Sequence, residues 1–461
     1  MNKKLCLIVI LCSYISIIDA QKITGVLTSL KNQKISLVGN NGLNKYIIDS
    51  TIISEKGEFV LNYSTKDFGI GYINYNENRN FVLVLEKGDI ELEGQIFSIP
   101  ETVIFKKGLE NMFFTNFLET HIKIDNALRQ LLFTNKMYQE DTFYSGQKKF
   151  INSLQLEIDR LEEFDENSLS KIDLNTYIYW YLPIRKLITK IPSVVQLKTT
   201  DRLNYISKFR SLKYNDPKLY KSGLMNDLLE SQFWLIENSG LSQDSIYIQM
   251  NITIESILNS VSENEPLYNE ISKYLYDYFE KHSLFKASSY LSNIALSQKK
   301  VKIYDKQFKQ FQSYKEMKIG NMASDIIFSG DIFKNNIQIQ NPIKLSSIEA
   351  EYKVIIFGAS WCQSCSDEMM KLFPLYNFWK SKGIEVVFVS LDTDKDKFKK
   401  YISVMPFYSF CDYKKWDTQA VKDYYVNSSP TIYLLDKNNK ILMRSGLILA
   451  IDAWVKSYLN K

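Results

Sequence analysis

Histidine is nearly absent from this chain, which holds only two among its 461 residues, at positions 121 and 282. That is too few for a His-rich metal site, and a Ser-His-Asp triad would depend on one of these two side chains. The chain also has little excess of one charge: 57 Lys and Arg against 52 Asp and Glu give a net charge of +5. No dense basic run stands out, so nucleic acid is not an expected partner.

Glycine and proline are few as well, at 17 and 9 residues. These counts exclude collagen-like and low-complexity chains, while 45% hydrophobic and 24% charged residues are typical of globular proteins. At roughly 150 residues per domain, the length predicts about three domains. No apolar stretch beyond the N-terminus is long enough to cross a bilayer, so we expect no stable membrane span in the mature chain.

The first twenty residues have the pattern of an export signal. Residues 2–4 are a short basic region, residues 5–18 are mostly apolar, and Ala20 offers a small residue at the predicted cleavage site. The apolar run is too short for a bilayer core of about 30 Å, which needs about 20 residues. The alternative is a buried N-terminal helix or strand. We expect the mature chain, residues 21–461, to be soluble and exported, with the periplasm as its compartment.

Cysteine is scarce too. Removing the signal, which contains Cys6 and Cys12, leaves Cys362, Cys365 and Cys411. Neither signal cysteine follows the small residue that a lipoprotein signal requires, so lipid anchoring is disfavoured. An exported protein with a disulfide-built core would carry more cysteines, in even number. Two cysteines separated by two residues point instead to redox chemistry.

Residues 21–108 are expected to form an all-β domain, a small sandwich or barrel. Short strand-like runs are divided there by turn signals, of which 55–58 is one. Residues 109–317 are expected to be α-helical, because apolar side chains recur at helical spacing, as between residues 267 and 278. We interpret the aromatic stretch 177–182 as a helix buried in the core, and the alternative is a groove for a partner chain.

Residues 318–461 alternate strand and helix, which is typical of an α/β fold. Residues 352–357 and the continuous β-branched run 384–391 are predicted to be buried strands. A helix is predicted from Cys362 to about Trp379. The predicted fold class is therefore multidomain, with a C-terminal α/β domain preceded by a small all-β domain and a helical segment.

The segment 361–365, of sequence WCQSC, places two cysteines where a strand meets a helix. At a helix N-terminus, unpaired N–H groups and the positive end of the dipole stabilise a Cys362 thiolate, which is the attacking species in disulfide exchange. Cys365 follows one turn later and can resolve a mixed disulfide. A zinc site is the alternative, but structural zinc needs four ligands and only Cys411 remains as a further thiol.

With this motif, the segment 318–461 resembles the TlpA/ResA-type branch of the thioredoxin-like thiol-disulfide oxidoreductases. The matching residues are 318–326, 357–365, Glu368, 426–431 and 433–436. The resemblance implies a thioredoxin-like fold for this last third of the chain. The β segment at the start of the mature chain is similar in pattern to the poorly characterised domain that precedes such thioredoxin domains in exported Bacteroidota proteins.

The resemblance implies roles for further residues. Pro430 matches the family's cis-proline, which lies beside the disulfide and leaves the backbone of Ser429 to pair with an extended substrate. Glu368 follows Cys365 by three residues, on the same helix face, and matches a carboxylate that can assist deprotonation of that cysteine. The alternative for Glu368 is a solvated first-turn carboxylate favoured by the helix dipole. Trp361 is expected to pack beside the first cysteine and to shape the substrate surface.

Some residues depart from the family pattern or stand outside it. Ser364 occupies a position where many relatives have proline, which lacks an N–H, so serine restores a donor near the Cys362 thiolate. We therefore predict a less reducing couple than that of a Cys-x-Pro-Cys relative. Ile356 stands where cytosolic thioredoxins keep a buried acid, which leaves Glu368 as the proton relay. Cys411 is interpreted as a small buried hydrophobe, and the alternative is a third redox thiol.

The residues and the resemblance together predict an exported thiol-disulfide oxidoreductase that needs no metal or other cofactor. The expected partners are protein thiols and disulfides and a membrane-bound electron donor. Reductase, oxidase and isomerase share the motif and differ in potential and partner. A peroxiredoxin is disfavoured, because its single peroxidatic cysteine would not lie in a Trp-Cys-x-x-Cys frame. The alternative hypothesis is a binding protein in which residues 21–317 capture a partner and the thioredoxin domain is a redox accessory.

Overall fold

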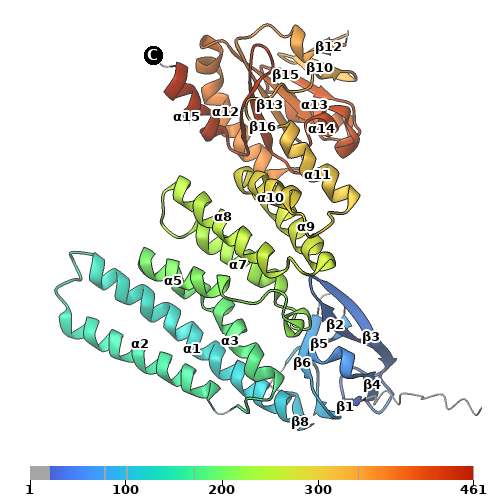
Figure 1. Ribbon diagram of the computed structural model, residues 1–461, viewed down its shortest axis with the longest axis vertical. Coiled ribbons are helices and arrows are strands. Elements are labelled where there is room, and N and C mark those ends of the chain that lie inside the picture. The colour runs from blue at the N-terminus through green and yellow to red at the C-terminus, as the bar shows by residue number, and fades with distance from the viewer. Residues whose placement is uncertain (1–20, 77–78, 100–101, 171, 341, 460–461) are drawn as a thin grey trace, which may run out of the picture. The chain divides into compact units, whose positions relative to one another are not determined.

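The computed structural model describes residues 21–459 apart from 77, 78, 100, 101, 171 and 341 (Figure 1). The predicted export signal, residues 1–20, lies outside the described residues. The chain divides into two compact units, of which the first ends at Gly240 and the second is Leu241–Lys461. The domain boundaries expected after residues 108 and 317 stay predictions.

In the described part of the chain, the first unit opens with eight strands in two four-stranded sheets, ordered β4-β1-β7-β8 and β3-β2-β5-β6. The strands are β1 (Gln21–Leu27), β2 (Lys34–Asn41), β3 (Asn44–Ile52), β4 (Glu58–Tyr63), β5 (Gly69–Asn76), β6 (Arg79–Leu85), β7 (Ile90–Gly94) and β8 (Ile104–Lys107). Alternate residues point inward, so that Ile23 of β1 and Leu27 of the same strand are buried while Val26 is exposed. Ile23 shares one core with Leu37 of β2 and Ile73 of β5, so the two sheets form a sandwich.

Helices complete the first unit. They are α1 (Leu109–Glu140), α2 (Lys148–Leu169), α3 (Tyr177–Thr189), α4 (Ile191–Val194), α5 (Thr199–Arg210), α6 (Pro217–Tyr220) and α7 (Met225–Glu237). The aromatic stretch opens α3, where Ile178, Tyr181 and Leu182 are buried and Tyr179 is 39% exposed. The buried side chains agree with the interpretation of this stretch as a core helix.

The second unit begins with four helices that precede its sheet. They are α8 (Gln243–Ser260), α9 (Glu265–Lys281), α10 (Phe285–Ser297) and α11 (Asp305–Glu316). Local sequence explains where α9 starts, because the Asn264 side chain accepts a hydrogen bond from the Leu267 N–H and Pro266 lies in the first turn. Leu267, Ile271 and Leu275 recur at helical spacing on its buried face.

A seven-stranded mixed sheet, ordered β11-β10-β15-β14-β13-β16-β17, forms the centre of the second unit in the described residues. Its strands and the small β9–β12 pair are β9 (Ile327–Phe328), β10 (Asp331–Lys334), β11 (Ile337–Ile339), β12 (Ile343–Lys344), β13 (Tyr352–Gly358), β14 (Ile384–Ser390), β15 (Tyr408–Cys411), β16 (Thr431–Asp436) and β17 (Ile441–Ser445). The interior strand β13 runs parallel to β14 and antiparallel to β16. The strands predicted at 352–357 and 384–391 are confirmed as β13 and β14.

Both faces of this sheet are covered, which explains why β13 and β14 are apolar without alternation. The flanking helices are α12 (Gln363–Ser381), α13 (Lys395–Ile402), α14 (Gln419–Asp423) and α15 (Ile448–Leu459). Val354 and Ile356 pack in one core with side chains of α12, α13 and α15, whereas Ile355 and Phe357 pack in another with side chains of α14. The predicted fold class, all-β then helical then α/β, is confirmed (Figure 1). Among the described helices, none is both long and apolar enough for a membrane crossing.

Candidate active site

The two cysteines of the WCQSC segment lie at the junction between β13 and α12, as the sequence predicts. Cys362 is the N-cap residue of α12, and a disulfide joins it to Cys365 in the first turn. The Cys365 backbone N–H donates a hydrogen bond to Cys362 Sγ at 3.2 Å. Cys362 is 7% exposed and Cys365 is fully buried, so the first sulfur is the one that a partner can reach.

Three oxygen atoms surround the reachable sulfur. Ser364 Oγ is 3.4 Å from Cys362 Sγ, and Ser429 Oγ and the Ser429 carbonyl oxygen are each 3.6 Å from it. Together with the helix N-terminus and the Cys365 N–H, the hydroxyl groups can donate to a thiolate once the disulfide is reduced. The arrangement is therefore suited to hold negative charge on the first sulfur.

The loop that carries Ser429 is placed beside the disulfide by the start of β16. The Ser429–Pro430 peptide bond is cis, the conformation that the resemblance implies for this proline. Pro430 is buried and Ser429 is half-buried, and the Ser429 carbonyl oxygen lies next to Cys362 Sγ. The Thr431 hydroxyl donates to the Ser428 carbonyl at 2.8 Å and closes the loop locally. The pairing of Ser429 with a substrate stays a prediction.

Trp361 is 51% exposed, and the Lys415 ammonium group lies 5.1 Å from the centroid of its ring. A cation over the ring face is attracted by the quadrupole of the indole and restrains its orientation. The indole thus presents apolar surface directly before the first cysteine, where we expected it to shape a substrate surface.

Glu368 is buried, and both of its carboxylate oxygens have partners. Lys371 Nζ donates to Oε1 at 2.7 Å, and the Ile448 backbone N–H at the start of α15 donates to Oε2 at 2.7 Å. The nearby carboxylate raises the pKa of Lys371 through their hydrogen bond. Only 4% of Glu368 is exposed, so the alternative of a solvated first-turn carboxylate is wrong. Its role as proton acceptor for Cys365 stays a prediction.

Sequence reasoning missed Asp392, which follows β14 and fixes the segment before the tryptophan. Its carboxylate accepts from the Ser360 N–H at 3.1 Å, from the Ser360 hydroxyl at 2.6 Å and from the Ser390 hydroxyl at 2.7 Å. Asp392 is 1% exposed. A signal was available, because β13 and β14 are parallel neighbours and polar residues after each of them meet at one edge of the sheet.

Cys411 ends β15 and is fully buried as a free thiol. Burial raises its pKa to about 12. The thiol donates to the Asp392 carbonyl oxygen, with Sγ 3.4 Å from it. A buried, protonated thiol reacts slowly, which favours the structural interpretation of this residue over a third redox thiol.

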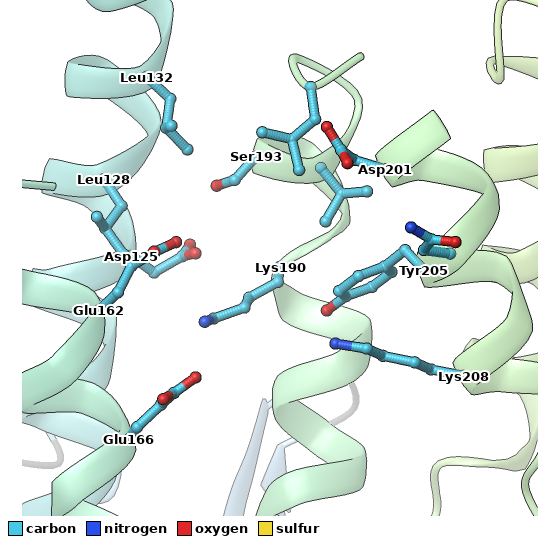
Figure 2. Close-up of a pocket in the computed structure, with 13 residues that line it drawn as sticks. Asp125, Leu128, Leu132, Glu162, Glu166, Lys190, Ser193, Asp201, Tyr205 and Lys208 are labelled. Atoms are coloured by element: carbon cyan, nitrogen blue, oxygen red, sulfur yellow. The ribbon is translucent and has the colours of Figure 1, made fainter. Parts of the chain in front are cut away.

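The first unit contains a separate cavity of about 320 Å³ between α1, α2, α4 and α5. Figure 2 shows the Lys190 and Lys208 ammonium groups and the Tyr205 hydroxyl directed into it, with Asp125 and Glu162 across the space. No cysteine lines this cavity, and the hypothesis that residues 21–317 capture a partner stays a prediction. Within the described residues, no cluster of three or more His, Cys, Asp or Glu side chains is arranged to hold a metal ion.

Two family models match the chain. A family described as "Thioredoxin-like" matches residues 350–441, and a "Domain of unknown function (DUF4369)" matches residues 21–104. Residues 350–441 are thus part of a thioredoxin-like domain that contains both cysteines, and the β sandwich is a DUF4369 domain. The resemblance stated from the sequence is confirmed in both parts.

Known proteins with similar segments include a nucleoredoxin and a thiol-disulfide oxidoreductase. Human nucleoredoxin is 28% identical over 130 residues, which cover 27% of this chain and 29% of nucleoredoxin. The thiol-disulfide oxidoreductase ResA of Oceanobacillus iheyensis is 31% identical over 122 residues, 26% of this chain and 62% of ResA. The matched segments thus span less than two thirds of either protein.

Among solved structures, the C-terminal domain of a putative thiol-disulfide oxidoreductase from Bacteroides thetaiotaomicron is similar to part of this chain. The match spans 32% of this chain and 98% of that domain's chain. The sequence identity is 22% and the TM-score is 0.27.

Proposed function

We propose that this chain is an exported thiol-disulfide oxidoreductase that exchanges disulfides with protein substrates through Cys362 and Cys365. One observation carries the proposal: the two cysteines form a disulfide at the start of α12, with the first sulfur the more exposed and surrounded by donors. Sulfur in this position is the usual site of thiolate chemistry in proteins. The thioredoxin-like family match supports the same chemistry.

The exchange balances without an added cofactor. In the reducing direction, the Cys362 thiolate attacks one sulfur of a substrate disulfide, forms a mixed disulfide and releases one substrate thiolate. Cys365, once deprotonated, attacks Cys362 Sγ, closes the internal disulfide and releases the second substrate thiolate. Two electrons pass to the substrate, whose two thiolates take up the protons that the two cysteines lose.

The reverse sequence oxidises a substrate dithiol and leaves the protein reduced, so the potentials of the two couples set the direction. Glu368, one turn after the second cysteine, would accept its proton in the resolving step. In the reducing direction the protein needs a source of two electrons after each turnover, for which we propose a membrane-bound donor in the compartment that receives the exported chain.

A trapping experiment tests the exchange. In the mature chain, residues 21–461, Cys365→Ser removes the resolving thiol, so Cys362 should accumulate as a mixed disulfide with a disulfide-bonded protein such as insulin. Cys362→Ser is the matched control and should form no adduct, because the buried second thiol is not reached by a protein substrate. An adduct through Cys365 instead, or full turnover by either variant, would contradict the mechanism.

A further inference from the structure

Two side chains of the loop before Pro430 are hydrogen-bonded to α9, which precedes the thioredoxin-like domain in the chain. Asn427 Nδ2 donates to the Tyr276 hydroxyl at 3.1 Å, and the Ser428 hydroxyl donates to the Glu280 carbonyl at 2.8 Å. Tyr276 and Glu280 are four residues apart, so they lie on one face of the helix. The two residues directly before Ser429 are therefore held from α9.

A buried ion pair connects the same helix to the end of the sheet. Arg444 of β17 donates to a Glu280 carboxylate oxygen at 2.9 Å, with side chains 7% and 2% exposed. The Tyr314 hydroxyl of α11 donates to the other oxygen. The Arg444 guanidinium lies 4.1 Å from the centroid of the Phe285 ring, which belongs to α10. Three helices before the thioredoxin-like domain thus enclose one arginine of its sheet.

Such a buried ion pair contributes little to the free energy of unfolding, and its main effect is on the positions of the elements that it joins. Removing two charges from water costs about as much as their attraction returns, so an apolar pair of similar volume would stabilise the fold equally well. A hydrogen-bonded charged pair can instead restrict the geometry of its partners. β17 pairs with β16, which starts directly after Pro430, so the ion pair fixes the strand that holds the loop.

A close approach of Gly446 to Ser283 lies on the same face. The turn after α9 places Ser283 in the left-handed region, at φ 57°. A Cβ atom on Gly446 would lie 2.6 Å from the Cβ of Ser283 and 3.5 Å from the Pro430 carbonyl oxygen. Such a distance leaves no room for a side chain, so only glycine permits this approach. The α9–α10 turn, the loop after β17 and the loop at Pro430 therefore meet at one point.

We propose that Ser428 and Glu280 are positioning residues, through which α9 holds the Ser429 backbone where an extended protein segment can pair with it. This inference rests on the proposed function. α9 covers one side of the loop. A groove of about 570 Å³ adjoins the start of the loop and is lined by Trp416, Val421, Lys422, Tyr425, Val426 and Asn427.

Ser428→Ala in the mature chain removes the hydroxyl that reaches α9 and leaves both cysteines untouched. We expect the KM for a protein substrate to rise about three- to tenfold, the effect of one hydrogen bond, with kcat unchanged. The rate at which dithiothreitol reduces the internal disulfide should not change, because a small reductant does not pair with the loop. The protein probe is insulin reduction or the oxidation of reduced ribonuclease, whichever the unsubstituted protein catalyses.

Two further variants separate positioning from general damage. Ser428→Thr keeps the hydroxyl and should restore the KM. Ser457→Ala removes a hydroxyl that donates to the Ala453 carbonyl at 2.8 Å within α15, and should change neither rate. An unchanged KM in Ser428→Ala, or an equal loss with dithiothreitol and with protein, would overturn the inference while leaving the proposed function intact. Failure of the unsubstituted protein in both protein assays would instead overturn the proposed function.

Discussion

Ser429 lies against Cys362 although 67 residues separate them in the chain: the Ser429 hydroxyl and carbonyl oxygens are each 3.6 Å from the sulfur. The contact joins the start of α12 to the loop before β16. Ser429 is half-buried, and its carbonyl oxygen lies beside the sulfur. A partner strand that paired with it would bring its own disulfide toward Cys362.

Ser364→Ala should make the couple more reducing. The Ser364 hydroxyl, 3.4 Å from Cys362 Sγ, can donate to the thiolate and so stabilises the reduced form. Its loss should lower the potential by roughly 20 mV, since one hydrogen bond is worth about 1 kcal/mol and about 30 mV corresponds to 1.4 kcal/mol. Ser364→Pro also removes the backbone N–H, in a first-turn position where proline is tolerated, and should lower it further. Equilibration with glutathione buffers measures both, and a rise in potential would contradict the assigned role of the hydroxyl.

Glu368→Gln should slow the resolving step. Glutamine keeps an acceptor for the Ile448 N–H but does not take up a proton, so resolution of a preformed mixed disulfide should slow at least about tenfold. Lys371→Met is the matched control, because it breaks the ion pair and leaves the carboxylate in place. Rapid-quench alkylation measures the rate at which the mixed disulfide is resolved. Equal slowing in both variants would mean that the ion pair, and not proton transfer, matters.

Ser360→Ala should destabilise the second unit. The Ser360 hydroxyl donates to the buried Asp392 carboxylate at 2.6 Å, and a hydrogen bond to a charged group contributes about 1.5–3 kcal/mol to the free energy of unfolding. Ser381→Ala removes an exposed hydroxyl that donates to the Phe378 carbonyl, and serves as the control with a smaller expected loss. Urea unfolding followed by tryptophan fluorescence compares the two. Equal losses would show that Asp392 does not fix the segment before Trp361.

Cys411 should stay unmodified in the folded protein. Burial raises the pKa of this thiol to about 12, so at pH 8 the reduced chain should be alkylated by iodoacetamide at Cys362 long before Cys411. Because the folded state holds the proton more tightly than the unfolded state, the stability this thiol contributes is complete below the ordinary thiol pKa. It is lost as the pH rises from that value toward about 12. Mass spectrometry after timed alkylation measures the order in which the two cysteines are modified. Early modification of Cys411 would favour the alternative that it is a third redox thiol.

The sequence predicts the redox junction well because its signals are local. An apolar run followed within a few residues by Cys362 and Cys365 requires a strand, a turn and a helix start, and these are β13 and α12. The short strand β15 was not predicted, since its four residues, YSFC, are too few for a clear period. The cis conformation of Pro430 could be predicted only from the family resemblance, because the local sequence alone indicates an ordinary turn.

The contacts of α9 could not be predicted, because they join distant residues with no local pattern. Glu280 and Arg444 are 164 residues apart, and Ser428 is 148 residues from Glu280. In the sequence, Glu280 is one more polar residue near the end of an amphipathic helix, and its burial depends on the sheet that follows. Asp392 differs from these residues, because the pairing of β13 with β14 offered a signal for its contact with Ser360 that sequence reasoning did not use.

The most direct test of disulfide exchange is a redox titration of the mature chain, residues 21–461, with Cys362 and Cys365 followed by thiol alkylation. We predict one two-electron transition in which both cysteines change together. A midpoint near about −270 mV would assign a reductase, and one near about −120 to −180 mV an oxidant or isomerase. Cysteines that stay alkylatable at every potential would contradict the redox function of this pair.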